Sequence, residues 1–297
     1  MTEHDLMADS RLPAAPPKHG ISPGRRALRT LYRDPPAVIG FAIVLLTVLV
    51  AVFARWLAPY DPQEMFVIDR MASPGGNYLF GTDNFGRDLL SRVVYGARTS
   101  LRVAAMVAVA STILGVFVGT VAGYYRRLDG SLMRVMDAMM AFPSILLALA
   151  IMAILGRSVM NVAVALTIVY TPAMARLVRS AVLSAKENEY VEALRALGGR
   201  DARLLIGHVL PNALSVIVVQ ATFIGVYAIL SEAALSFLGA GAPPSVPSWG
   251  NILAEGRVYM IDAPWIMIFP GLAITITVLG LNLLGDGLRD ALDPRSD

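Results

Sequence analysis

The sequence predicts an all-α membrane protein with six transmembrane helices. Hydrophobic residues make up 56% of the 297-residue chain and charged residues 16%, with a mean hydropathy of +0.61, whereas soluble domains have about 45–50% apolar and about 25% charged residues. A bilayer core of about 30 Å needs about 20 apolar residues per helix. Runs with few charged residues cover 37–57, 103–125, 138–156, 158–175, 209–231 and 263–285. These runs are too long for the strands of a membrane barrel, which use about ten residues each.

Residues 1–36 are expected to form a Pro-rich cytoplasmic tail, because they lack the apolar core and cleavage site of a signal peptide. Lys and Arg are enriched in cytoplasmic segments. With this tail inside, the segments 11–33, 126–134 and 176–203 and the C-terminal tail hold six, three, six and two of the 25 Lys and Arg residues. The net charge of +3 is therefore a topology signal, and no nucleic-acid partner is expected.

The segment 37–98 is expected to hold the first span and a long extracytoplasmic segment. Trp56 and Tyr60 can lie at the headgroup level after the span. The later part, "GTDNFGRDLLSRVVYGARTSL", has apolar residues at spacings of three and four, which predicts a separate amphipathic helix on the outer face. Asp88 and Arg92 are expected one turn apart on its polar side.

The segment 99–288 is expected to form a transmembrane domain of five helices, followed by a cytoplasmic tail over 289–297. Gly115, Gly119 and Gly123 form a stripe that lets another helix approach closely. This stripe fits either helices that move against each other or ordinary packing within the chain. Asp129 is expected to cap the next helix, and Pro143 to open the third span.

A cytoplasmic elbow is predicted over 181–211. Gly198 and Gly199 supply the backbone freedom that ends a helix, Asp201 is a good N-cap for a second short helix, and Pro211 can open the next span. A helix of about nine residues is marginal alone in water, so this one needs a partner. A solvated connecting loop is the alternative, although compact connections take only about four to six residues.

The chain carries no recognisable energy source or catalytic site. Its two lysines, Lys18 and Lys186, do not follow glycine, so no phosphate-binding G-K-[ST] loop exists, and no H-E-x-x-H zinc motif is present. Without cysteine there is no disulfide or thiolate metal site. Asp286 lies in a G-D-G triplet, but a second carboxylate for an aspartyl protease is not evident. No catalytic or metal-binding residue is predicted.

The elbow resembles the EAA motif of bacterial ABC importer permeases. Matching positions are Glu192, Ala193, Gly198, Leu210 and Pro211, while Leu194 stands in place of the usual alanine and His208 in place of isoleucine. The stretches "GTDNFGRDLLSR", "SEAALSFLGAGAPP", "PSWG" and "NLLGDGLRDALDP" are similar to the peptide/nickel subfamily, specifically its dipeptide-permease C-type subunit. The resemblance covers nearly all of residues 35–295.

This resemblance implies a type I ABC importer permease fold and a non-catalytic half of a translocation pore in a bacterial or archaeal inner membrane. The implied partners are a homologous B-type permease, two cytoplasmic ATP-binding subunits and an extracytoplasmic substrate-binding protein. ATP and Mg²⁺ would bind in the ATP-binding subunits, and the chain itself would hold no cofactor. Peptides come first among implied substrates, with nickel complexes or glutathione-like molecules next. A self-contained channel or secondary transporter is the alternative function.

Several polar residues within spans are candidates for a substrate path: Asn161, Gln220, Glu232, Thr275 and Thr277. A carboxylate at the depth of Glu232 is costly and must face protein or water. It can meet a substrate amine, or it can hold two helices together through hydrogen bonds.

Overall fold

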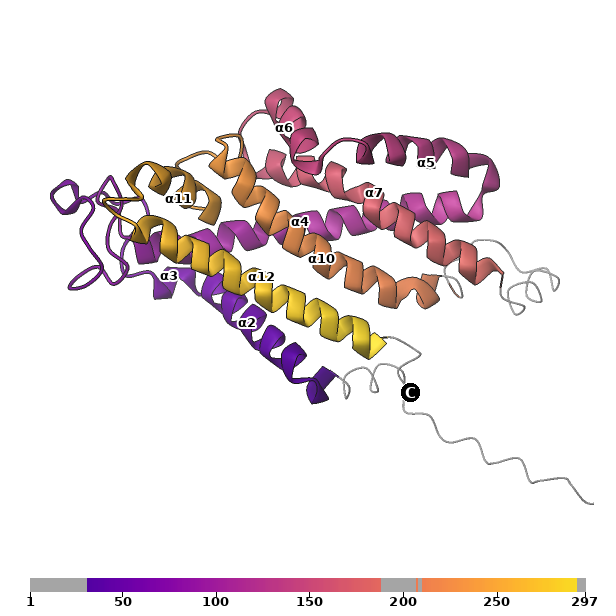
Figure 1. Ribbon diagram of the computed structural model, residues 1–297, viewed down its shortest axis with the longest axis horizontal. Helices are drawn as coiled ribbons and strands as arrows, with labels where there is room; N and C mark the ends of the chain where they lie inside the picture. Colours follow the sequence, from indigo (N-terminus) through magenta and orange to yellow (C-terminus); the bar gives the residue numbers. More distant parts are fainter. Residues whose placement is uncertain (1–30, 188–206, 208–209, 293–297) are drawn as a thin grey trace, which may run out of the picture.

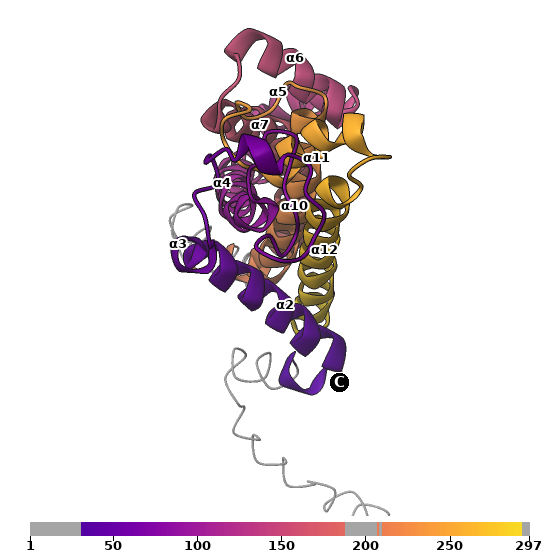
Figure 2. The same cartoon turned by 90° about the vertical axis from the view of Figure 1, so that its left-hand side faces the viewer.

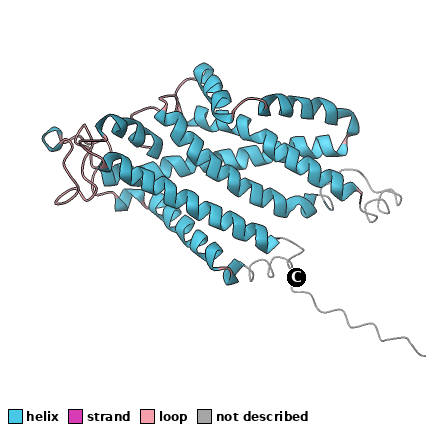
Figure 3. Ribbon diagram, in the orientation of Figure 1, coloured by secondary structure: helices cyan, strands magenta, loops and turns pink. Residues whose placement is uncertain are grey.

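The computed structural model describes residues 31–187, 207 and 210–292. In these ranges the protein consists of helices and loops, with no β-strand (Figure 3). The helices are α2 (Pro35–Val52), α3 (Ala54–Leu57), η1 (Val67–Asp69), α4 (Leu89–Tyr124), α5 (Arg126–Met140), α6 (Ser144–Leu155), α7 (Val159–Lys186), α10 (Leu210–Phe237), α11 (Trp249–Gly256), η3 (Arg257–Tyr259) and α12 (Trp265–Leu292). The prediction of an all-α protein is confirmed.

Five of these helices, α2, α4, α7, α10 and α12, are long and apolar enough to cross a membrane. The pair α5 and α6, bent by 93°, provides the sixth candidate. Residues 58–88 and 238–264 gather at one end of the bundle, here called the loop end (Figure 1). α2 begins and α12 ends at the opposite end, here called the termini end. Seen from the loop end, α2 lies at one edge of the bundle and α5 and α6 lie at the other (Figure 2).

The expectation of a separate outer amphipathic helix is wrong. The predicted segment is the first part of α4, which runs for 36 residues without interruption, about 54 Å at 1.5 Å per residue. This length exceeds a bilayer core of about 30 Å, so α4 projects from the membrane at the loop end. The projecting part buries Leu89, Val93 and Ala97 against the loop-end segments, which explains its apolar periodicity. The expected division of the chain after residue 98 falls inside this helix.

The third span is broken at Pro143, immediately before α6. Proline lacks an N–H and disfavours the helical conformation in the preceding residue, here Phe142. α6 has 12 residues, about 18 Å, and cannot span the core alone. α5 begins at Arg126, so Asp129 lies in its first turn rather than at the N-cap as expected. Its carboxylate pairs with Arg179 instead of capping the helix.

The glycine stripe of α4 packs against α7, and the two helices run in the same direction from the loop end. A Cβ on Gly115 would lie 2.5 Å from Cβ of Met174, and one on Gly123 would lie 2.9 Å from Cβ of Val182. Real Cβ atoms almost never make contacts shorter than 3.0 Å. In this conformation the stripe therefore packs α4 against α7 of the same chain. This matches the interpretation of ordinary packing within the chain rather than that of helices that move against each other.

A second glycine seam joins α2 to α12. A Cβ on Gly40 would lie 2.6 Å from the backbone N of Leu284, and one on Gly280 would lie 2.5 Å from Cγ2 of Ile43. Because lipid tails are as apolar as leucine, close backbone approach of this kind is what holds membrane helices together. α2 is consequently bound to the last helix of its own chain.

Candidate functional site

The predicted elbow, 181–211, begins within the last two turns of α7. Its residues Glu192, Ala193 and Gly198 lie outside the described part of the chain, whereas Leu210 and Pro211 form the first turn of α10 at the termini end. α7 ends at Lys186 and α10 starts at Leu210. The elbow therefore connects two membrane helices at the termini end of the bundle.

Lys186 fixes the end of α7 to the end of α4. Its ammonium donates hydrogen bonds to the carbonyl oxygens of Gly123, at 3.2 Å, and Tyr124, at 3.1 Å. The last carbonyls of a helix have no partner inside the helix and carry its negative dipole end, so a cation there is stabilising. The ammonium also lies 5.1 Å from the centre of the Tyr124 ring. The last residue of α7 is thus held on the α4–α5 corner.

Two arginines of α7 hold α5 alongside it. Arg179 makes a two-pronged contact with Asp129, with Nη2 2.7 Å from Oδ2 and Nε 2.5 Å from Oδ1. One turn earlier, Arg176 donates to Asp137 at 2.7 Å. The Asp129 pair is about one quarter exposed and the Asp137 pair about half exposed. These pairs and Lys186 join α4, α5 and α7 into one unit beside the elbow.

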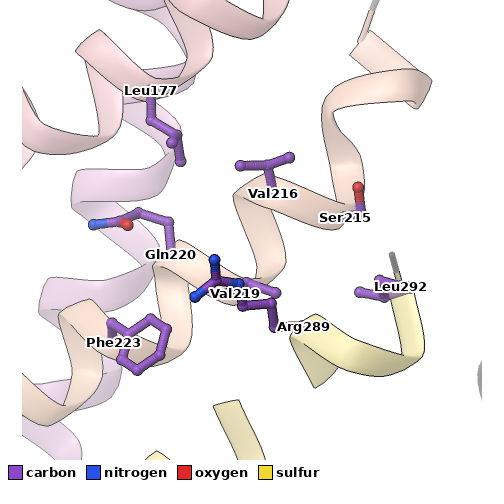
Figure 4. A pocket seen from close by; sticks show the side chains of 8 residues that line it. All are labelled: Leu177, Ser215, Val216, Val219, Gln220, Phe223, Arg289 and Leu292. Carbon is purple, nitrogen blue, oxygen red and sulfur yellow. The ribbon is translucent and has the colours of Figure 1, made fainter. Parts of the chain in front are cut away.

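Gln220 of α10 lies between two cavities. The first, of about 430 Å³, opens between α7, α10 and α12 (Figure 4). Polar side chains of Ser215, Gln220 and Arg289 line it together with the apolar Leu177, Val216, Val219, Phe223 and Leu292. The second, of about 350 Å³, lies towards α6 and is lined by Gln220, Tyr170 and Tyr227 among others. Of the five candidate path residues, Gln220 lines both of these cavities, and the other four line neither.

Glu232 joins three helices. Its side chain is 1% exposed and accepts hydrogen bonds from Ser100 of α4 and Ser236 of α10, both at 2.9 Å. The Ser100 hydroxyl also accepts from the backbone N–H of Trp249, the first residue of α11, at 3.4 Å. The Trp249 ring nitrogen donates to the carbonyl of Val93 at 3.0 Å. This geometry matches the second alternative for Glu232, a carboxylate that holds helices together.

The other three candidates contact their own or adjacent backbone. Asn161 donates to the carbonyls of Leu155 and Gly156 and so caps the end of α6. Thr275 donates to the Gly271 carbonyl on an exposed face of α12, and Thr277, 2% exposed, donates to the Ala273 carbonyl. Their part in a substrate path stays a prediction.

An ion cluster at the loop end was missed by the sequence analysis. The guanidinium groups of Arg87 and Arg92 both pair with Asp83 and with Glu255, with Arg87–Glu255 at 2.6 Å and Arg92–Glu255 at 2.7 Å. Arg92 and Asp83 are buried, so the expectation that Arg92 lies on a polar outer face is wrong. The i, i+4 spacing of Asp83 and Arg87 was a local signal, but Glu255 on α11 is too distant in sequence to be foreseen. The cluster ties the loop-end segment 58–88 to α4 and α11.

Tyr78 makes a hydrogen bond within the loop-end segment 58–88. Its hydroxyl donates to a carboxylate oxygen of Asp69 at 2.9 Å. Loss of hydration, and then the hydrogen bond and negative charge of Asp69, raise the pKa of Tyr78 to about 12. The hydroxyl therefore remains a donor throughout the physiological pH range.

Comparisons with known proteins agree on one family. Residues 111–297 match the family described as "Binding-protein-dependent transport system inner membrane component", and residues 22–74 match the "N-terminal TM domain of oligopeptide transport permease C". A putative peptide transport system permease protein of Brucella abortus is 52% identical over 94% of each chain. The dipeptide transport system permease protein DppC of Alkalihalophilus pseudofirmus is 44% identical over 99% of this chain and 98% of its own. The glutathione transport system permease protein GsiD of Escherichia coli is 43% identical over 96% and 94%.

One solved structure has a similar fold. It is an inward-facing conformation of the MetNI methionine ABC transporter, with a TM-score of 0.57 and 22% identity over 68% of this chain and 96% of that chain. At this identity the likeness supports the fold alone.

Proposed function

The chain belongs to the family of binding-protein-dependent transport system inner membrane components, and from that premise we propose that it forms half of the pore of an ATP-driven importer of di- or oligopeptides. As an ABC permease, the chain is a multi-pass inner-membrane protein and not an enzyme; a partner permease and separate ATPase subunits complete the transporter. The observation that carries the peptide substrate is the 44% identity to a dipeptide permease over 99% of this chain. The relative named for glutathione, itself a small peptide, fits the same substrate class.

The finer assembly follows from the same premise. The partner permease is a homologous B-type subunit, two cytoplasmic ATP-binding subunits hold ATP and Mg²⁺, and an extracytoplasmic binding protein delivers the substrate. Both chain termini face the cytoplasm. Two features support this orientation: α2 begins and α12 ends at the same end of the bundle, and the α4–α5 corner at that end carries Arg126 and Arg127.

The elbow 181–211 is the element on which the ATP-binding subunits act. Glu192, Ala193, Gly198, Leu210 and Pro211 are its coupling residues by their match to the EAA motif. The contacts of Lys186 with the end of α4 support this role, because they fix the end of α7, so that a movement of the elbow is passed on to α4 and α7. For ATP to drive a change of packing, the ATP-binding subunits must bind one packing more strongly than the other.

The substrate passes along the face of the bundle that carries Gln220. Cavities next to Gln220 on both sides, lined by Ser215, Arg289, Tyr170 and Tyr227, support this placement, since peptide groups need hydrogen-bond partners when they leave water. The burial of Glu232 and Thr277 within the chain favours Gln220 over these two residues.

The test is transport in proteoliposomes. The complex of this chain with its partner subunits and binding protein is expected to accumulate a radiolabelled dipeptide only with ATP, and this chain alone is expected to be inert. Glu192→Lys and Gly198→Pro are expected to leave the complex assembled and to uncouple ATP hydrolysis from uptake, whereas Glu64→Lys, an exposed position at the loop end, serves as a matched charge control. Uptake by the chain alone would favour a self-contained channel or secondary transporter and would refute the proposal.

A further inference from the structure

An apolar groove of about 780 Å³ lies on the side of α10 away from Gln220, between α2, α4, α10 and α12. Val44, Val48 and Val52 line it from α2, and Leu281 and Leu284 line it from α12. Apart from Thr222 and two arginines of α4, Arg98 and Arg102, every lining residue is apolar. The groove is therefore unlike the polar cavities beside Gln220.

The arginines lie at the membrane surface. At the termini end, the partly exposed ion pairs of Arg176 and Arg179 lie near the level of Gly119 on α4, since a Cβ on Gly119 would lie 3.0 Å from the backbone N of Arg179. Exposed charged pairs of this kind lie outside the apolar core, so counting back about 20 residues, the thickness of that core, places its opposite edge near residue 99. Arg98 then lies at that edge and Arg102 about 5 Å inside it, where its long side chain extends towards the headgroup layer.

The position of α2 gives the same depth for the two arginines by a separate argument. Its last residues Ala51 and Val52, followed by the exposed Trp56, line the groove beside the arginines, and Val44 lines its deeper part. Eight residues of helix separate Val44 from Val52, about 12 Å of depth. The groove thus runs from the headgroup level at the loop end towards the middle of the membrane.

Arg98 and Arg102 are the charged groups of this groove, and both are exposed. Arg87, Arg92, Arg176 and Arg179 each pair with a carboxylate. Among the described residues, no carboxylate lies within salt-bridge distance of Arg98 or Arg102. Two cations one turn apart, above an apolar groove, offer complementary charge to a ligand with an anionic head and a hydrocarbon tail.

We propose that this groove is a binding site for an anionic phospholipid of the loop-end leaflet, with its phosphate held by Arg98 and Arg102 and an acyl chain lying along Val44–Val52. Arginine suits phosphate because its planar guanidinium can donate two parallel hydrogen bonds. A peptide substrate is disfavoured here, because its backbone would lose water with only Thr222 to replace it. This inference depends on the chain's place in the membrane and is independent of the peptide substrate.

The experiment counts lipids bound to the assembled transporter. The complex in detergent would be mixed with equimolar phosphatidylglycerol and phosphatidylcholine of identical acyl chains, and retained lipid would be measured by native mass spectrometry. The wild type is expected to prefer phosphatidylglycerol by about tenfold or more, the effect of one or two charge-assisted hydrogen bonds. Arg98→Gln/Arg102→Gln is expected to lose this preference, and Arg98→Lys/Arg102→Lys to keep most of it.

A second variant tests the acyl-chain groove without touching a charge. Gly225 lines the groove, and an added Cβ there meets nothing within 4 Å, so Gly225→Leu fills space that a chain would occupy. This variant is expected to retain less of both lipids. Gly271→Leu is the matched control, because Gly271 also has open space but lies on α12 outside the groove.

Two results would overturn the proposal. One is an unchanged phosphatidylglycerol preference in the double glutamine variant together with unchanged lipid retention in Gly225→Leu. The other is loss of the partner permease from the complex in both variants, which would assign the groove to the interface between subunits.

Discussion

Gly119 offers the sharpest test of the packing of α4 on α7. A Cβ at this position would lie inside 3.0 Å of the Ala175 carbonyl oxygen and 2.8 Å from Cβ of Val178. The oxygen belongs to the α7 backbone, so no side-chain rotation can relieve the clash. Gly119→Ala therefore forces the two helices apart or bends one of them.

The expected magnitude is the balance of two effects. Overpacking a well-packed contact costs about 1–3 kcal/mol, whereas alanine is more favourable than glycine within a helix by about 0.8–1.0 kcal/mol. The net loss for Gly119→Ala is thus about 0–2 kcal/mol, and the clash with backbone atoms of α7 places it towards the upper end of that range. At Gly271 an added Cβ meets nothing within 4 Å, so Gly271→Ala is expected to be neutral or to stabilise by up to about 1 kcal/mol.

The assay is thermal unfolding of the assembled transporter in detergent, followed by size-exclusion chromatography of the heated samples. Gly119→Ala is expected to melt at a lower temperature than the wild type, and Gly271→Ala at the same or a higher temperature. Equal melting temperatures for the two alanine variants would refute the argument that backbone contact sets the α4–α7 distance.

Three further predictions concern charged groups. Arg92→Met removes a buried cation from between two carboxylates, so it is expected to destabilise the complex by about 3–5 kcal/mol in thermal unfolding; adding Asp83→Asn should recover part of the loss, and no recovery would contradict the pairing. Glu232→Gln keeps one oxygen that accepts from a serine hydroxyl, and its amide NH2 can donate to the oxygen of the other serine. Dipeptide uptake is therefore expected to change less than about tenfold; a specific loss of substrate affinity would instead place Glu232 on the path. Asp129→Asn weakens a partly exposed pair with Arg179, so it should cost at most about 1 kcal/mol of stability; its coupling ratio of ATP hydrolysed per dipeptide should nevertheless rise, and an unchanged ratio would separate this pair from coupling.

The transmembrane helices were predictable because the membrane restricts which residues can lie within its apolar core. A helix in lipid needs a long apolar run, and each of the predicted runs overlaps a helix of the structure. Helix ends in water were less predictable. The apolar residues at spacings of three and four before residue 103 predicted a separate surface helix, but a helix can continue out of the membrane when one face packs on protein, as α4 does.

Contacts between distant segments could not be predicted from sequence. The pairing of Arg87 and Arg92 with Glu255 brings together residues more than 160 positions apart. The sequence around either arginine does not indicate that Glu255 is its partner. The role of Glu232 could be narrowed to two alternatives, because a buried carboxylate needs either a ligand or hydrogen bonds; the choice required the positions of Ser100 and Ser236. The elbow residues Glu192 and Gly198 lie outside the described residues, so their coupling role remains a prediction.

The contacts of α10 suggest how a push at the elbow would reach the cavities. Glu232 of α10 accepts a hydrogen bond from Ser100 of α4, and Ser100 in turn accepts one from Trp249 of α11, so the loop end of α10 is fixed. The half of α10 nearer Leu210 lies between the cavities beside Gln220 and the apolar groove. At 1.5 Å per residue, Leu210 lies about 33 Å and Gln220 about 18 Å from Glu232, so a tilt of about 10° would move them by about 6 and 3 Å. The chain has no cysteine, so spin labels can be placed at Leu214→Cys or Leu230→Cys, each paired with Leu279→Cys on α12. ATP binding is expected to change the 214–279 distance more than the 230–279 distance, because position 230 lies close to the pivot; equal changes would mean that α10 moves as a whole and that Glu232 is not its pivot.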